Sequence, residues 1–186
     1  VLLEKNLVND RKWLEYSVYP LYSPQSLIAE GTANYGVAMA FPDALKKSFQ
    51  RDVLYPLAGI DPALLDKYEA LLKLIAQLSY AGNEAARDYI DGKMTKQQAI
   101  DWLINVELYP VEKAPQRISF FDVNRSYVIN YNVGKDLVKD YVEYKTRGAT
   151  TEPEKTELGW QVFEQLLSSP RLPSNLKAES SPPKPK

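Results

Sequence analysis

The chain contains no cysteine and no histidine among its 186 residues. Without cysteine it can form neither a disulfide framework nor a thiolate site for zinc or an iron–sulfur cluster, and it has no thiol nucleophile. Without histidine it can build neither a Ser–His–Asp triad nor an HExxH zinc helix from its own residues. Any catalysis by this chain alone must therefore use carboxylates, Lys, Tyr, Ser or Arg.

A strong net charge and long apolar runs are also missing. The 23 basic and 24 acidic residues leave a formal charge of −1. This charge supplies no field that attracts a polyanion, and no local basic patch stands out, so nucleic acid is not an expected partner. The longest apolar runs, such as residues 37–41, are far shorter than the roughly 20 residues that span a bilayer. We expect no membrane span, and the cellular compartment is left open.

The sequence does contain repeated signals for helices. Apolar residues recur three and four positions apart along most of the chain, as on one face of a helix. Ser23-Pro24 and Asp61-Pro62 are cap-plus-proline signatures, and Thr95 with Gln98 forms a capping box. No run alternates with period two except the ambiguous residues 118–123. We therefore predict an all-α fold of seven or eight helices.

The composition changes near the C-terminus. Five of the 13 prolines lie from Pro170 onward, and large apolar residues become rare there. Such a segment lacks the apolar surface that would offset the entropy of ordering it. We expect a single helical domain over residues 1–170, as a fragment of a larger catalytic domain, and a disordered Pro-rich tail over residues 171–186.

Glu30 is hard to explain as ordinary packing, because it is the one charge in a helix-like run from residue 27 to residue 41. A carboxylate buried in a helix costs free energy unless a cation or hydrogen-bond donors meet it. Gly31 and Gly36 are poor helix formers, and their presence indicates that something approaches the helix closely. Glu30 is thus either one half of a structural ion pair with an Arg, or a metal ligand or catalytic carboxylate.

Residues 122–135 form a second unusual stretch. We predict that they open a single helix over residues 122–147, although the stretch is rich in Asn, Tyr and β-branched residues, which are mediocre helix formers. Helical spacing places Arg125 and Tyr131 near one face, with Tyr127 on its flank. Such a face can donate hydrogen bonds to a substrate oxyanion or carboxylate. The alternative is a hydrogen-bonded core seam between helices.

The sequence EGTANY at residues 30–35 resembles the E-G-x-A-x-Y motif of helical zinc-metallopeptidase-like proteins of the DUF885 type, within the gluzincin group. In that family a helix with HExxH supplies two His ligands and the general-base Glu, and the E-G-x-A-x-Y helix supplies the third ligand about 25 to 40 residues later. The resemblance implies that Glu30 is a zinc ligand. Asn34 falls where many gluzincins place an Asp that orients a zinc-bound His, so Asn at this position departs from the pattern.

The sequence RSYVINYNVG at residues 125–134 resembles the late Y-x-x-G segment of the same family, in which a Tyr points at the metal site. The resemblance implies that Tyr131 stabilises the tetrahedral oxyanion of the substrate, with assistance from Arg125 or Tyr127. These three residues would then be the catalytic contribution of this chain.

The resemblance also implies what lies outside the chain. The chain begins at Val1 instead of a methionine. We expect the segment that carries HExxH to precede Val1. Zinc and a peptide substrate would belong to the complete protein. Since catalytic zinc needs three protein ligands, the chain alone is expected to be inactive and to bind zinc weakly or not at all.

Two alternatives come from other classes of protein. In the first, the chain is a stand-alone helical binding or scaffold domain in which Glu30 and Arg125 form a structural ion pair, packed shut instead of facing an open cavity. In the second, it is a histidine-free carboxylate enzyme, such as a prenyl-diphosphate synthase. That enzyme requires Asp-rich helices that hold magnesium, and the acidic pairs at residues 88 and 91 and at residues 136 and 140 are too sparse.

Overall fold

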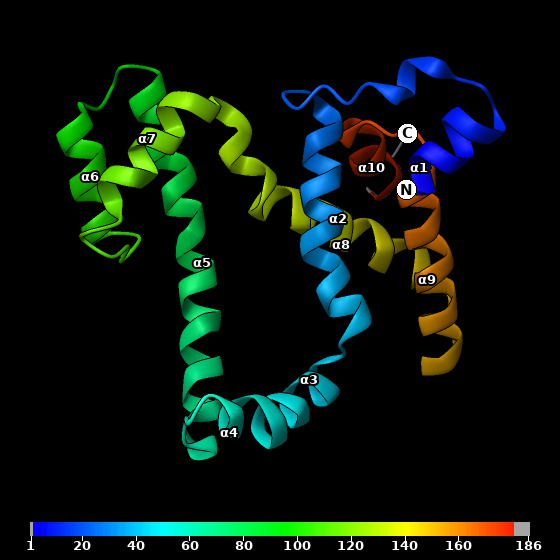
Figure 1. Cartoon of the computed structure of the whole chain (residues 1–186), viewed down its shortest axis with the longest axis horizontal. Helices are drawn as coiled ribbons and strands as arrows, with labels where there is room; N and C mark the ends of the chain where they lie inside the picture. The colour runs from blue at the N-terminus through cyan, green and yellow to red at the C-terminus, as the bar shows by residue number, and fades with distance from the viewer. Residues whose placement is uncertain (1, 181–186) are drawn as a thin grey trace, which may run out of the picture. The chain divides into compact units, whose positions relative to one another are not determined.

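The computed structural model describes residues 2–180, and within this range helices are the only regular secondary structure, which confirms the predicted all-α fold (Figure 1). None of the described helices is both long enough and apolar enough to cross a membrane. The helices are α1 (Leu2–Glu4), α2 (Pro24–Ala40), α3 (Asp43–Phe49), α4 (Tyr55–Leu57), α5 (Leu65–Ile90), α6 (Lys96–Asn105), α7 (Ala114–Asn124), α8 (Asn132–Thr146), α9 (Glu152–Ser168) and α10 (Pro173–Ser180). Short π-helical turns cover Lys5–Asp10 and Gln50–Leu54, and short 3-10 helices cover Leu14–Ser17, Pro62–Leu64 and Arg125–Asn130.

Helices begin at the positions that the capping signals in the sequence predict. The Asp61 side chain accepts a hydrogen bond from the backbone N–H of Ala63 at 2.9 Å. Thr95 and Gln98 exchange both hydrogen bonds of the capping box. Helix α2 begins at Pro24 as expected, but the Ser23 hydroxyl is buried with no hydrogen-bond partner among the described residues. At that start the fixed φ of proline, and not a side-chain cap, accounts for the helix boundary.

The chain folds as two compact units, which differs from the single domain expected over residues 1–170. The first unit contains the residues up to Met39 together with those from Ile129 onward, and the second contains Ala40–Val128. The physical reason is that the buried apolar residues form two separate clusters, one in each unit. Helical periodicity shows which face of a helix is apolar, but it does not show which other helix covers that face.

In the first unit, α2, α8, α9 and α10 surround one core. Helix α10 lies where a disordered tail was expected, and that expectation is wrong for residues 173–180 because Leu176 is fully buried and α10 packs against α8. Residues 181–186 of the expected tail lie outside the described residues. The buried members of this core are Ile28, Val138, Tyr141, Val142, Val162, Phe163, Leu166 and Leu176.

Helices α2 and α8 cross at a pair of glycines (Figure 1). A Cβ atom added to Gly31 would lie 2.5 Å from the carbonyl carbon of Gly134, and one added to Gly134 would lie 2.5 Å from the backbone oxygen of Leu27. The two backbones therefore touch with no side chain between them. This explains Gly31 within α2, since the close approach predicted from the sequence is an approach by another helix.

In the second unit, the C-terminal half of α5 packs with α6 and α7. The indole N–H of Trp102 donates a hydrogen bond to the backbone oxygen of Ala81 at 3.0 Å, which ties α6 to α5. Residues 118–123, which were ambiguous between strand and helix, belong to α7. The buried members of this core are Ala85, Ala86, Ala99, Leu103, Ala114, Ile118, Phe121 and Val128.

The single helix predicted over residues 122–147 is wrong. Helix α7 ends at Asn124, and Arg125 has φ of +51° and ψ of −127°, values outside the helical region. A 3-10 helix (Arg125–Asn130) follows before α8 begins at Asn132. A positive φ at a residue other than glycine costs about 1–3 kcal/mol, so the surrounding structure must hold Arg125 in this conformation. The poor helix formers of this stretch reflect a real break.

Replacement of Gly31 by Ala tests the glycine crossing. The new methyl group must displace the α8 backbone, so Gly31→Ala is expected to lower the free energy of unfolding by about 2–3 kcal/mol. Gly148 is a matched control in the same unit, because a Cβ added there meets nothing within 4 Å and its φ is not positive. Gly148→Ala should change stability by less than about 1 kcal/mol. Urea unfolding measures both, and equal effects would show that the close contact is absent.

Candidate functional site

Glu30 lies on α2, half-buried, and directly precedes the crossing glycine Gly31. Since residues on a helix advance by about 1.5 Å each, its backbone lies within one turn of the point where α8 crosses. The Glu30 side chain is therefore close to the part of α2 that another helix approaches. It is neither fully buried nor on a freely solvated face.

The other residues of the EGTANY segment have structural roles. The Asn34 side chain is exposed, and its amide N–H donates a hydrogen bond to the backbone oxygen of Glu30 at 2.9 Å. Tyr35 is half-buried and packs edge-to-face against Phe163, with the ring centroids 6.2 Å apart. Burial, together with the nearby charge of Glu143, raises the pKa of the Tyr35 phenol. Tyr35 is thus a neutral part of the first core.

Tyr131 immediately precedes α8 and lies three residues before the crossing glycine Gly134. Its side chain is 37% exposed. The two segments that resemble the metallopeptidase family, EGTANY and the late Y-x-x-G, therefore meet in the first unit. They meet through the glycine of each segment.

Arg125 and Tyr127 belong to the second unit, whereas Glu30 and Tyr131 belong to the first. Arg125 is exposed and Tyr127 is half-buried. The helical face predicted to unite Arg125 with Tyr131 does not exist, because the chain leaves the helical conformation at Arg125. The two residues are instead separated by a 3-10 helix (Arg125–Asn130).

Metal ligands are few. Within residues 2–180 no three Asp or Glu side chains come close enough together to hold a metal ion. Glu30 is the one residue for which the sequence predicts metal ligation, and a single carboxylate does not fit the three protein ligands that catalytic zinc needs. The described residues are compatible with the contribution of one ligand to a site, and not with a complete zinc site.

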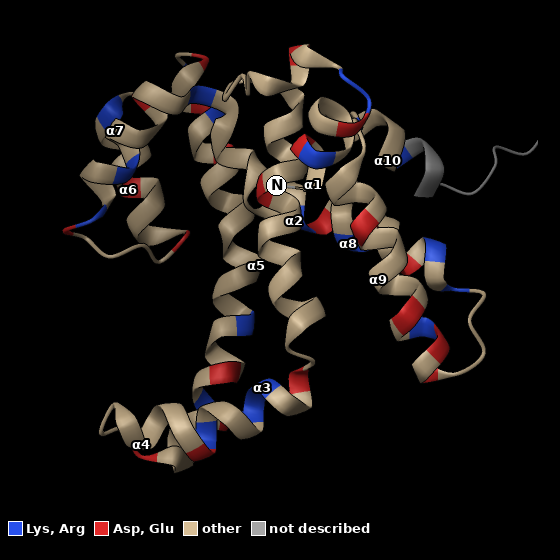
Figure 2. Ribbon diagram, turned by 45° about the vertical axis from the view of Figure 1, so that its right-hand side comes forward, with Lys and Arg blue, Asp and Glu red and all other residues tan. Residues whose placement is uncertain are grey.

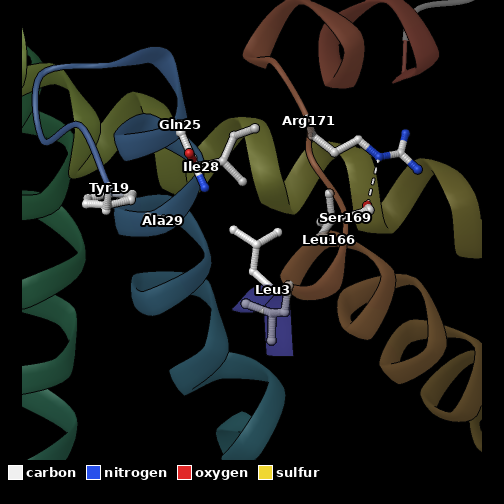
Figure 3. A pocket seen from close by; sticks show the side chains of 9 residues that line it. Leu3, Tyr19, Gln25, Ile28, Ala29, Leu166, Ser169 and Arg171 are labelled. Atoms are coloured by element: carbon white, nitrogen blue, oxygen red, sulfur yellow. Dashed lines mark hydrogen bonds between the residues drawn. The ribbon is translucent and has the colours of Figure 1, made fainter. Parts of the chain in front are cut away.

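A small apolar cavity of about 180 Å³ lies beside the first turns of α2 (Figure 3). Arg171 stands at its edge, where its Nε–H donates a hydrogen bond to the Ser169 hydroxyl at 3.4 Å. None of the predicted site residues lines the cavity. The lining residues are Leu3, Tyr19, Gln25, Ile28, Ala29, Leu166, Leu167, Ser169 and Arg171.

Glu107 is a polar residue in an unusual environment that sequence reasoning missed. Its carboxylate packs against Gly82 of α5, where an added Cβ would lie 2.5 Å from Oε2. Among the described residues, neither Oε2 of Glu107 nor the Nε–H of Arg117 has a hydrogen-bond partner. Burial raises the pKa of Glu107, and the positive charge of Arg117 opposes this effect. No motif or spacing marks Glu107, which lies in the short connection after α6.

Comparison with known proteins gives no match for this chain, whether with protein-family models, with curated proteins or with solved structures. The case for a function therefore depends on the residues and their placement.

Replacement of Glu107 by Gln tests its burial. The folded state raises the pKa above the ordinary value of 4.5, so the folded protein binds the proton more readily than the unfolded chain. The ionised group therefore lowers stability once the pH rises through the folded pKa. Glu107→Gln should raise the free energy of unfolding at pH 7 by about 1 kcal/mol, and this gain should shrink as the pH falls toward 4.

Chemical unfolding between pH 4 and pH 8 measures this difference. Glu112→Gln is the control, because Glu112 is exposed in the connection between α6 and α7. It should change the free energy of unfolding at pH 7 by less than about 0.5 kcal/mol. A loss of stability on Glu107→Gln at pH 7 would contradict the prediction, because it would mean that the ionised carboxylate stabilises the fold.

Proposed function

We propose that this chain supplies one carboxylate metal ligand, Glu30, and one oxyanion-stabilising hydroxyl, Tyr131, to a zinc-dependent peptidase-like hydrolase. The other two ligands and the general base would come from a segment carrying HExxH that is not part of the chain. The observation that supports this proposal is the crossing of α2 and α8 at Gly31 and Gly134. It brings together the two segments on which the resemblance depends, although they are far apart in the sequence.

Each glycine has a role in this proposal. Because Gly31 follows Glu30 directly, the carboxylate projects from the turn of α2 that α8 contacts. Because Gly134 lies one turn after Tyr131, the start of α8 is held beside the same place. A backbone contact with no intervening side chains leaves the two helices little room to change their spacing, and a catalytic site requires its groups to be held in a precise geometry.

The proposed chemistry of the chain's own residues is limited. Zinc, when bound, activates water and polarises the scissile carbonyl of a peptide. The Glu30 carboxylate would contribute one oxygen ligand and part of the negative charge that balances the metal. The Tyr131 hydroxyl would donate a hydrogen bond to the oxygen that becomes negative in the transition state. Asn34, whose side-chain amide donates a hydrogen bond to the backbone oxygen of Glu30, would help to hold that turn of α2.

The stability of a Glu30→Gln variant separates this proposal from the scaffold alternative. A metal ligand is not needed for folding, so Glu30→Gln should change the free energy of unfolding by less than about 0.5 kcal/mol. In the scaffold alternative Glu30 forms an ion pair with Arg125, and its removal should cost about 2 kcal/mol or more. Glu164→Gln on the exposed face of α9 is the matched control.

The unaltered chain tests the expectation that it binds zinc weakly or not at all when isolated. Elemental analysis of the isolated chain after dialysis should find much less than one zinc per chain, and peptide substrates should not be cleaved. Tight stoichiometric zinc binding by the isolated chain would contradict the proposal, because the missing ligands would then not be needed.

Tyr131→Phe tests the proposed oxyanion-stabilising role of the Tyr131 hydroxyl. The variant is made in a protein that also includes the HExxH segment. Loss of one oxyanion donor typically lowers kcat by about 10²-fold or more, while the metal ligands are untouched. We therefore expect normal zinc content with a strongly reduced kcat and little change in KM. Tyr35→Phe is the control, because Tyr35 packs in the core, and it should keep most of the activity. A Tyr131→Phe enzyme with full kcat would exclude Tyr131 from the reaction.

A further inference from the structure

Helix α10 is attached to the first unit through one buried side chain. Among residues 173–177, whose side chains the structure describes, Leu176 alone is buried, and its neighbours Asn175 and Lys177 are exposed. Helix α10 packs against α8, and Leu176 belongs to the buried cluster of the first unit. Leu176 is therefore the apolar anchor of α10.

The shortness of α10 makes its structure depend on this anchor. It has 8 residues, and isolated helices shorter than about 12–15 residues are only marginally stable in water. Its start is defined locally. The backbone N–H of Leu172 donates a hydrogen bond to Oδ1 of Asn175 at 3.0 Å, and the backbone N–H of Asn175 donates one to the backbone oxygen of Leu172 at 2.9 Å. Neither bond reaches α8, so release of Leu176 should unwind α10.

The other helices of the first core have contacts that do not involve α10. Helices α8 and α9 pack against each other, and α2 meets α8 at the contact between Gly31 and Gly134. A helix held by few buried contacts can open locally while the rest of a domain stays folded. We expect α10 to be such a helix. The buried members of the core that remain without it are Ile28, Val138, Tyr141, Val142, Val162, Phe163 and Leu166.

A short connection, residues 169–172, keeps α10 close to α8. Within it, Ser169 and Arg171 line the cavity beside α2 (Figure 3). The Arg171 guanidinium lies over the Tyr141 ring of α8, 5.9 Å from the ring centroid and near the limit of about 6 Å for a cation–π contact. A connection of this length holds a released helix at an effective concentration on the order of 1 mM beside its site. A site that binds α10 weakly is therefore still occupied.

The composition of α10 indicates what the site on α8 accepts. Figure 2 shows little charge on α10, and in the sequence its charged residues are Lys177 and Glu179, of opposite sign. Attachment therefore depends on the shape and the apolar surface of one leucine instead of on charge. Short helices that place an apolar anchor in a hollow of another protein are a recurrent form of peptide recognition.

We propose that α8 carries a docking site for a short, weakly charged helix with one leucine anchor, and that α10 fills this site as a displaceable strap. A peptide segment of the same chemistry, presented by another molecule, can take the place of α10. A docked α10 competes with such a partner, so the apparent affinity of the partner falls with the fraction of molecules in which the site is open. The strap thus makes binding of the partner depend on its own release.

Binding of a free peptide to the whole chain tests this proposal. The peptide has the sequence of residues 169–180 and is added at millimolar concentration to the isotope-labelled chain. In the Leu176→Ala chain, whose own α10 has lost its anchor, the peptide should give saturable shifts of the α8 amide signals in NMR spectra. The unaltered chain should bind the peptide at least about 10-fold more weakly, because its own α10 occupies the site.

Leu172→Ala is the matched control. It makes the same change of side chain at a position that is 53% exposed, and this chain should bind the peptide as weakly as the unaltered chain does. A peptide that carries Leu176→Ala should bind to none of the three chains, because it lacks the anchor. The dispersed NMR signals of α2, α8 and α9 should persist in the Leu176→Ala chain.

Hydrogen exchange of the unaltered chain gives an independent measurement. The amides of α10 should exchange at least about 100-fold faster than the buried amides of α8, since α10 opens without the rest of the first unit.

Several results would overturn the proposal. Exchange of α10 and α8 at one common rate, or unfolding of the first unit in the Leu176→Ala chain, would show that α10 is a permanent part of the core. Absence of peptide binding to that variant, or equal binding to the variant and the unaltered chain, would show that α8 carries no such docking site. None of these outcomes depends on zinc or on peptidase activity, so the strap and the proposed function can fail separately.

Discussion

The contact between Gly31 and Gly134 is the constraint on which the first unit depends. Two helices normally pack about 8–10 Å apart because side chains separate them. Here the backbones of α2 and α8 touch, so a side chain on either glycine would force the two helices apart. The surrounding apolar side chains, Ile28 on one helix and Val138 on the other, fill the space on either side of the crossing. Glu30 and Tyr131 lie beside this crossing, half-buried and 37% exposed respectively.

Much of the local structure could be predicted from sequence. Helix starts at Asp61-Pro62 and Thr95 were predicted correctly, because proline and side-chain caps act over three or four residues and are visible in a short window. The sequence also indicated a close approach at Gly31. It could not identify Gly134 as the partner, since a glycine shows that space is needed but not which segment fills it.

The features that were missed depend on long-range contacts. Helix α10 forms in a Pro-rich segment because a single apolar side chain, Leu176, is buried against α8, and composition averages over such a residue. The break at Arg125 lies next to the boundary between the two units, since Val128 is buried in the second core while α8 belongs to the first unit. Glu30 was singled out because it is the one charge in an apolar run, but its half-burial beside a helix crossing could not be inferred from one helix alone.

The division of the chain has a consequence for the order of folding. The second unit is a continuous stretch, Ala40–Val128, whereas the first unit is assembled from two stretches on either side of it. Contacts that are close in sequence form faster, because less loop-closure entropy is lost. During synthesis the second unit can fold as soon as it has emerged from the ribosome. Helix α2 is synthesised before α8 and α9, so its apolar face stays uncovered until those two helices have been made.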